Sequence, residues 1–105
     1  MQMELRTAFA EALREIRDRK GLTQEDFSTV SSRTNISLLE RAKTIPTLEK
    51  LQQLCTILDV HPVTVMAICY SKMEDISVQS VLATVAAEKH ALERAEEHHL
   101  EIPRR

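Results

Sequence analysis

The sequence predicts an all-α protein, in which a five-helix domain over residues 1–73 precedes an added long C-terminal helix and tail over residues 74–105. The 105 residues contain one Gly and three Pro, whereas folds built from many short strands need repeated turn residues with positive φ. Apolar residues of the types favoured in packed helices recur at spacings of three and four. A composition of 43% hydrophobic and 29% charged residues is typical of a globular chain.

The first predicted helix covers residues 5–20, and a short second helix covers residues 24–30. The first has an apolar stripe that starts at Leu5 and continues at spacings of three and four. Gly21 follows it, at the place where a helix C-terminus favours a left-handed residue. Thr23 then provides a hydroxyl that can cap the N-terminus of the second helix.

The third predicted helix covers residues 33–41 and begins after Ser32, a favourable N-cap. Ile36 and Leu39 form its inner edge, because they are three positions apart. The opposite face of this helix is short and mostly polar, and we expect it to point outward. Four residues share that face: Thr34, Ser37, Leu38 and Arg41.

Proline residues separate the next two predicted helices from their neighbours. Pro46 prevents continuation of the third helix, and Thr47 caps a fourth. Pro62 is placed as the first residue of a fifth helix, which runs to about Tyr70. The apolar stripe of the fourth helix consists of Leu48, Leu51, Leu54, Cys55 and Leu58.

The last predicted helix runs from Asp75 to about Leu100 without Pro or Gly. It has a heptad-like apolar seam, diluted with Ala and one Glu. Such a seam must be buried, so it predicts a subunit interface in a homodimer, and a dimer of dimers also fits so long a helix. The alternative is that the helix folds back on its own domain. The seam consists of Val78, Val81, Leu82, Val85 and Leu92.

The net charge of −2 is unevenly distributed along the chain. Residues 1–73 carry a balance of +1, and residues 74–105 carry a balance of −3. Any basic surface for a nucleic acid must therefore be local and lie in the first part. The three aromatic residues argue against a protein that stacks single-stranded bases on aromatic side chains.

Several function classes lack support in the sequence. Cys55 and Cys69 are expected to be buried, reduced thiols, and His90, His98 and His99 are expected to line a solvated helix face rather than a metal site. No motif in the sequence indicates a catalytic triad or a phosphate-binding loop. We expect no secretory signal, and no apolar run in the sequence is long enough for a membrane span. We therefore expect a cytoplasmic protein that is not an enzyme, with no metal, cofactor or membrane partner.

Two segments carry a resemblance to a known family. IRDRKGLTQEDF (16–27) and SSRTNISLLERAKTIPTLEKLQQLCTILDV (31–60) resemble the phage-repressor/Cro, or xenobiotic-response-element (XRE), family of helix-turn-helix regulators. The resemblance covers about residues 5–70 and implies a repressor-like helix-turn-helix domain of bacterial or phage origin. Two departures stand out: the stretch between Phe27 and Ser32 is short, and Ala42 occupies the family's Gly position after the recognition helix.

The resemblance also implies which residues contact DNA. The recognition helix begins at Arg33, whose guanidinium can pair with guanine, and Leu38 can contact a thymine methyl group. Arg17 and Glu40 resemble a structural ion pair and are assigned to the fold. The base-reading candidates are Arg33, Thr34, Ser37 and Leu38. The phosphate-binding candidates are Gln24, Arg41, Lys43, Thr44 and Thr47.

The expected function is that of a sequence-specific regulator of transcription. It would bind double-stranded DNA as a homo-oligomer on a two-fold or pseudo-palindromic operator and repress by excluding polymerase, although activation also fits. The alternative is a helical adaptor of the antitoxin or anti-regulator type, which would use the C-terminal helix to bind a regulatory protein partner. Leu38 and the acidic balance favour this alternative slightly.

Overall fold

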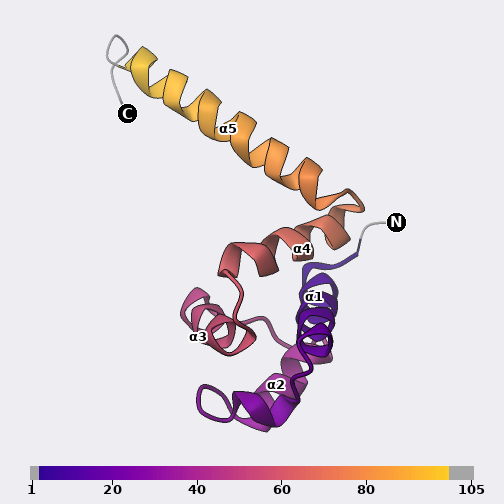
Figure 1. Cartoon of the computed structure of the whole chain (residues 1–105). Coiled ribbons are helices and arrows are strands. Elements are labelled where there is room, and N and C mark those ends of the chain that lie inside the picture. The colour runs from indigo at the N-terminus through magenta and orange to yellow at the C-terminus, as the bar shows by residue number, and fades with distance from the viewer. Residues whose placement is uncertain (1–2, 100–105) are drawn as a thin grey trace.

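The computed structural model describes the backbone of residues 3–99 and the side chains of residues 3–95, and every regular element in this part is a helix. The all-α prediction is confirmed. Figure 1 shows the arrangement of the elements along the chain. They are α1 (Leu5–Arg19), the 3-10 helix η1 (Gln24–Phe27), α2 (Arg33–Glu40), α3 (Leu48–Leu58), α4 (Pro62–Glu74) and α5 (Val78–His99).

The elements α1 to α4 and η1 share one hydrophobic core. The helix α1 packs against both α2 and α4, so its apolar stripe connects these two helices through the core. Phe9 and Phe27 are the largest side chains with no more than 1% exposure, and the aromatic ring of Phe27 joins η1 to this core. The other fully buried large side chains are Leu13, Ile36, Leu54, Leu58, Val65 and Cys69.

Local chemistry starts the helices at the positions that the sequence indicates. The side chains of Ser32 and Thr47 each accept a hydrogen bond of 3.1 Å from the backbone N–H three residues later. The Nδ1 atom of His61 accepts a bond of 3.0 Å from the N–H of Val63, just after Pro62. These caps satisfy donors that the first turn of a helix leaves unpaired.

The second helix was predicted to be longer than the structure has it. Instead of a helix over residues 24–30, η1 is a 3-10 turn that ends at Phe27. Thr23 and Asp26 form a capping box that tightens the start of this turn, with 2.7 Å between the Thr23 nitrogen and the Asp26 carboxylate. The N–H groups of Val30 and Ser31 both donate to the carbonyl of Phe27, which closes the turn before another helical turn can form.

Two helix boundaries and one core position also differ from the prediction. The helix α4 continues past Tyr70 to Glu74, and α5 begins only at Val78. Leu48 was predicted in the apolar stripe of the fourth helix, but it is 81% exposed because it is the first residue of α3. No single helix within residues 3–99 is long and apolar enough to cross a membrane, and α3 with α4 passes that test only as a pair bent by 104°.

A left-handed residue separates α4 from α5. Asp75 has a φ of 55°, and the N–H of Ile76 donates to the carbonyl of Ser71 at 3.1 Å. The hydroxyl of Ser77 then accepts a bond of 3.0 Å from the N–H of Ser80 and starts the last helix. Asp tolerates the left-handed conformation better than most residues, which explains a helix end without glycine here.

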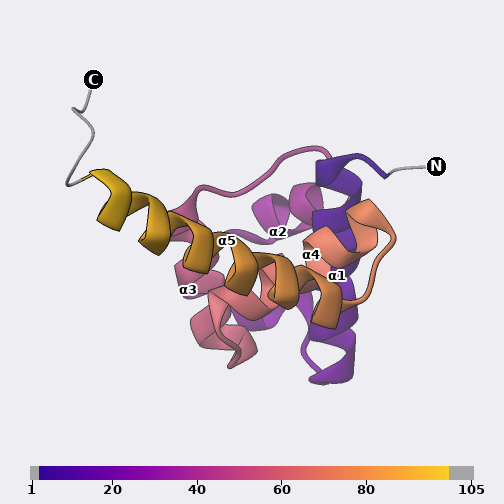
Figure 2. The ribbon, with the colours of Figure 1, turned by 90° about the horizontal axis from the view of Figure 1, so that it is seen from above.

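Figure 1 shows that the helix α5 extends away from the rest of the molecule, and in the view from above in Figure 2 its C-terminal end projects beyond the other helices. The described structure is 54 Å long and only 30 and 23 Å across. Val78 and Val81 are half-buried near α4, whereas every side chain from Leu82 to Ala95 is exposed. Over this stretch α5 does not fold back on its own domain.

Ala42 adopts a φ of 60°, in the left-handed region that favours glycine. Placing a residue with a Cβ in this region costs about 1–2 kcal/mol of stability. A glycine avoids that strain, but its unfolded chain is more flexible, so folding costs it more conformational entropy and the net gain is smaller. We expect Ala42→Gly to raise the free energy of unfolding by about 0.5 kcal/mol and Ala42→Val to lower it. Urea denaturation of the two variants measures both changes, and a shift in the same direction for both would refute the strain.

Candidate nucleic-acid interface

The helix α2 presents two different faces. Ile36 and Leu39 point into the core, with exposures of 0% and 4%. Arg33 and Thr34, at the N-terminal end, are exposed, and Ser37 is half-buried one turn later. This amphipathic helix therefore keeps a polar, partly open face outside the core, as the spacing of its residues predicts.

A polar hollow of about 370 Å³ lies between η1 and α2. Its lining contains two guanidinium groups and no carboxylate, so the hollow is locally positive although the whole chain carries a net charge of −2. The structure thus brings together five of the nine residues that the sequence predicts for DNA contact. The lining residues are Gln24, Arg33, Thr34, Ser37 and Arg41.

The other four predicted contact residues lie outside this hollow. Lys43 and Thr44 are exposed in the segment after α2, and Thr47 is exposed at the start of α3. The Thr47 oxygen already accepts the N–H of Lys50, which leaves its O–H able to donate. Leu38 is half-buried rather than fully exposed.

The helix α2 is anchored by a buried ion pair. The guanidinium of Arg17 donates from Nε to Oε2 of Glu40 at 2.6 Å and from Nη2 to Oε1 at 3.0 Å. The side chain of Glu40 is 3% exposed and that of Arg17 is 15% exposed. Arg17 also donates to the carbonyl of Leu22 at 2.8 Å. This one side chain therefore connects α1 to α2 and also to the loop that precedes η1. The predicted Arg17–Glu40 pair is confirmed.

The environment raises the pKa of Arg17 above its usual value. The largest cause is the hydrogen bond to Glu40, and the negative charges of Glu40 and Asp18 act in the same direction. Burial opposes this shift because it disfavours the charged guanidinium. The guanidinium of Arg17 is therefore held in its charged form, and its planar group donates two hydrogen bonds to the side chain of Glu40.

A second partner of Glu40 was missed by the sequence analysis. The side-chain amide of Gln24 donates from Nε2 to Oε1 of Glu40 at 3.0 Å. Gln24 belongs to the hollow, whereas Glu40 belongs to the buried side of α2. The ion pair assigned to the fold is thus directly connected to the predicted contact surface, and nothing in the spacing of residues 24 and 40 indicates this.

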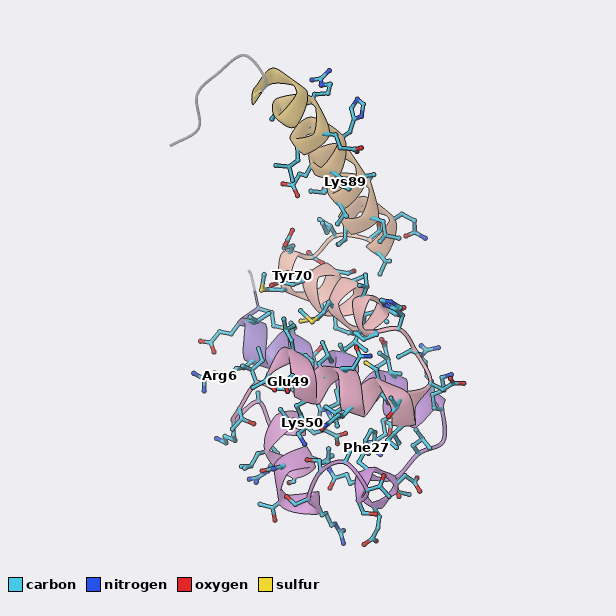
Figure 3. The ribbon with its side chains drawn as sticks, turned by 90° about the vertical axis from the view of Figure 1, so that its left-hand side faces the viewer. Arg6, Phe27, Glu49, Lys50, Tyr70 and Lys89 are labelled. Carbon is cyan, nitrogen blue, oxygen red and sulfur yellow. The ribbon has the colours of Figure 1, made fainter. Side chains whose placement is uncertain are left out.

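Arg6 is a further cation near the predicted contact residues. Its Nη1 donates to the carbonyl of Lys43 at 3.4 Å, and Figure 3 shows the side chain at the edge of the domain. Arg6, Ala10, Leu13 and Arg17 follow one another at spacings of four, three and four, so they share one face of α1. Arg17 on this face bonds to Glu40 at the end of α2, and Arg6 bonds to the segment that follows α2. The spacing was a usable signal that the sequence analysis did not exploit.

Comparison with protein families identifies the same helical segment as a helix-turn-helix. A family model described as helix-turn-helix matches residues 13–65, which include the C-terminal part of α1, all of η1, α2 and α3, and the start of α4. The match therefore covers half of the chain, and it contains both the hollow and all nine residues that the sequence predicts for DNA contact. A comparison with curated proteins gives no significant match.

Two solved structures have a similar fold. A crystal structure of the clp gene regulator ClgR from C. glutamicum is 28% identical, with a TM-score of 0.63 over 70% of this chain and 96% of that one. Another crystal structure of ClgR from Corynebacterium glutamicum, 24% identical, has a TM-score of 0.64 over 99% of this chain and 100% of that one. The second comparison concerns the fold alone, and its coverage includes α5. With the family match across its central half, this chain belongs to the XRE-type helix-turn-helix family and is a DNA-binding transcriptional regulator.

Proposed function

We propose that the protein reads the sequence of double-stranded DNA as a homodimer that binds a two-fold or pseudo-palindromic operator. The observation that carries this proposal is the hollow between η1 and α2, which gathers two arginines and three polar side chains. An α-helix fits the major groove of B-DNA, and residues at its N-terminal end reach the base edges. Arg33 and Thr34, at the N-terminal end of α2, are exposed.

The proposed base readers occupy the outward side of α2. Arg33 is the first residue of the helix and can donate two hydrogen bonds to O6 and N7 of guanine. Thr34 and Ser37 can donate to or accept from a base edge. Leu38 is assigned an apolar contact with a thymine methyl group, and its half-burial limits that contact to the part of the side chain that remains accessible.

The proposed phosphate contacts surround the base readers. Gln24 and Arg41 lie in the hollow itself, and the Nε atom of Arg41 donates to the hydroxyl of Ser37 at 3.1 Å. Lys43, Thr44 and Thr47 are exposed where α2 leads into α3. Contacts of this kind fix the register of a protein on DNA without reading the sequence.

Homodimerisation through α5 would place two recognition helices on one operator. Leu82, Val85 and Leu92 are 48%, 57% and 68% exposed, so a stripe of large apolar side chains lies in contact with water. A second copy of the same helix can cover this stripe, and the exposed alanines on α5 allow close approach. Two half-sites about 34 Å apart then meet successive major grooves, and a dimer of dimers remains compatible with the length of α5.

The DNA contacts can be tested with two substitutions that affect different parts of recognition. Arg33→Ala is expected to weaken operator binding by about 1–3 kcal/mol and to relax the preference at one base pair of each half-site. Lys43→Ala is expected to weaken all sequences alike and to reduce the slope of log K against log salt by about one unit. Titration of labelled duplexes at several salt concentrations measures both effects. Unchanged operator affinity in Arg33→Ala would remove Arg33 from the base-reading group.

A second candidate function is that of an adaptor that binds a regulatory protein through α5. The exposed stripe on a helix that extends from the domain favours this candidate. A gel-shift experiment with genomic fragments distinguishes the two candidates. Retention of specific fragments at moderate salt supports the operator-binding homodimer, whereas capture of a protein partner without specific retention supports the adaptor.

A further inference from the structure

The carboxylate of Glu40 has two hydrogen-bonding partners with different roles. Its Oε1 atom accepts one bond from Nη2 of Arg17 and one from Nε2 of Gln24, each of 3.0 Å. Its Oε2 atom accepts a bond of 2.6 Å from Nε of Arg17. Glu40 is 4% exposed and therefore cannot contact a DNA duplex itself. Its side chain links the buried ion pair to the hollow, because Oε1 accepts from both Arg17 and Gln24.

The partner chemistry determines how the Gln24 amide is oriented. A carboxylate only accepts hydrogen bonds, so the NH2 group of Gln24, and not its carbonyl oxygen, must face Glu40. The carbonyl oxygen and the second N–H are then left for other contacts. Because Gln24 lines the hollow, those two groups are available to a ligand that approaches α2 from outside.

We propose that Glu40 is a positioning residue for DNA recognition, because it holds the Gln24 amide in one orientation before DNA binds. This inference rests on the proposed function, in which Gln24 contacts the DNA backbone. A side chain that is already ordered in the free protein loses less conformational freedom when it binds. The buried pair therefore contributes to DNA affinity as well as to the stability of the fold.

Arg17 makes a carboxylate compatible with this location. A negative charge directly behind a phosphate-binding side chain would repel the DNA backbone, and the repulsion would be strong in a poorly solvated site. The two bonds from Arg17 to Glu40 neutralise that charge within the domain. The carboxylate can then orient Gln24 without adding a net negative charge next to the hollow.

The orientation can be measured in the free protein by NMR. The side-chain amide protons of Gln24 are expected to exchange with water more slowly than those of Gln52 and Gln53, which are exposed on α3. The substitution Glu40→Gln is expected to remove this difference. Exchange of the Gln24 amide in the wild type at the rate of Gln52 and Gln53 would overturn the proposal, and this comparison needs no variant to fold.

The effect on DNA binding can be measured with a double-mutant cycle on the operator selected by the wild type. Glu40→Gln is expected to weaken binding by about threefold to tenfold at a temperature at which it is fully folded. In a Gln24→Ala background, the same substitution should have no further effect. The core variant Ile16→Val serves as the control, because it lowers stability and leaves in place every side chain that hydrogen-bonds to Gln24 or Glu40.

Two results of the cycle would overturn the inference while leaving the proposed function intact. Equal weakening by Glu40→Gln in both backgrounds would mean that Glu40 acts through the fold alone. Unchanged operator affinity in Gln24→Ala would mean that no Gln24 contact exists to be positioned. Failure of the proposed function is a different result, in which the wild type itself selects no operator sequence, and the positioning role would fall with it.

Discussion

Replacement of Arg17 by Ala is expected to lower the free energy of unfolding by about 3 kcal/mol or more. The substitution removes both hydrogen bonds that neutralise Glu40, whose side chain is 3% exposed. The remaining carboxylate would stay buried with only the Gln24 amide as a partner. The substitution would also remove the hydrogen bond that the Leu22 carbonyl accepts from Arg17 near the end of α1. The cost is therefore the stranding of a buried charge and not just the loss of one contact.

Urea denaturation followed by circular dichroism measures this change. Arg19→Ala is the matched control, because Arg19 is an exposed arginine two residues further along the same helix. Its substitution should change the free energy of unfolding by less than about 0.5 kcal/mol. Equal stabilities of the two variants would show that the Arg17–Glu40 pair contributes nothing measurable to the fold.

The double substitution Leu82→Glu with Val85→Glu is expected to convert the protein into a monomer. Both side chains are about half exposed in the single chain, so the substitutions leave the domain itself intact. In a dimer they would bury four carboxylates within an apolar interface, which is strongly unfavourable. Because a dimer binds two half-sites at once, operator affinity should fall by about 100-fold or more.

Sedimentation velocity and operator titration measure the two consequences. The control carries Ala87→Glu and Ala91→Glu, which add the same charge on the opposite face of α5. This control is expected to remain a dimer with nearly normal operator affinity. A dimeric Leu82→Glu/Val85→Glu protein would place the subunit interface outside the apolar stripe of α5.

The features that sequence analysis predicted well depend on local chemistry. Ser32 and Thr47 start their helices because a side-chain oxygen lies within reach of the first-turn N–H groups, whatever the rest of the fold does. Gly21 has a φ of 69° at the end of α1 for a similarly local reason. The Arg17–Glu40 pair could be predicted only from the family resemblance, because 23 positions separate the two residues in the sequence.

The features that sequence analysis missed depend on how the helices pack. The second helix ends at Phe27, where the N–H groups of Val30 and Ser31 both bond to the Phe27 carbonyl, and helical periodicity alone gives no sign of that. The bond between Gln24 and Glu40 requires η1 and α2 to lie at a particular distance. Leu48 has the spacing of a core residue, yet it starts α3 beyond the edge of the packed helices and stays exposed.

The central claim is that α2 reads a DNA sequence, and selection of bound duplexes from a random pool tests it most directly. The wild type is expected to enrich one sequence arranged as two half-sites about 10 base pairs apart, centre to centre, and related by a two-fold axis. The Arg33→Ala protein, selected in parallel, should lose the preference at one base pair of each half-site. Enrichment of no sequence by the wild type, or identical preferences of the two proteins, would contradict this account of α2.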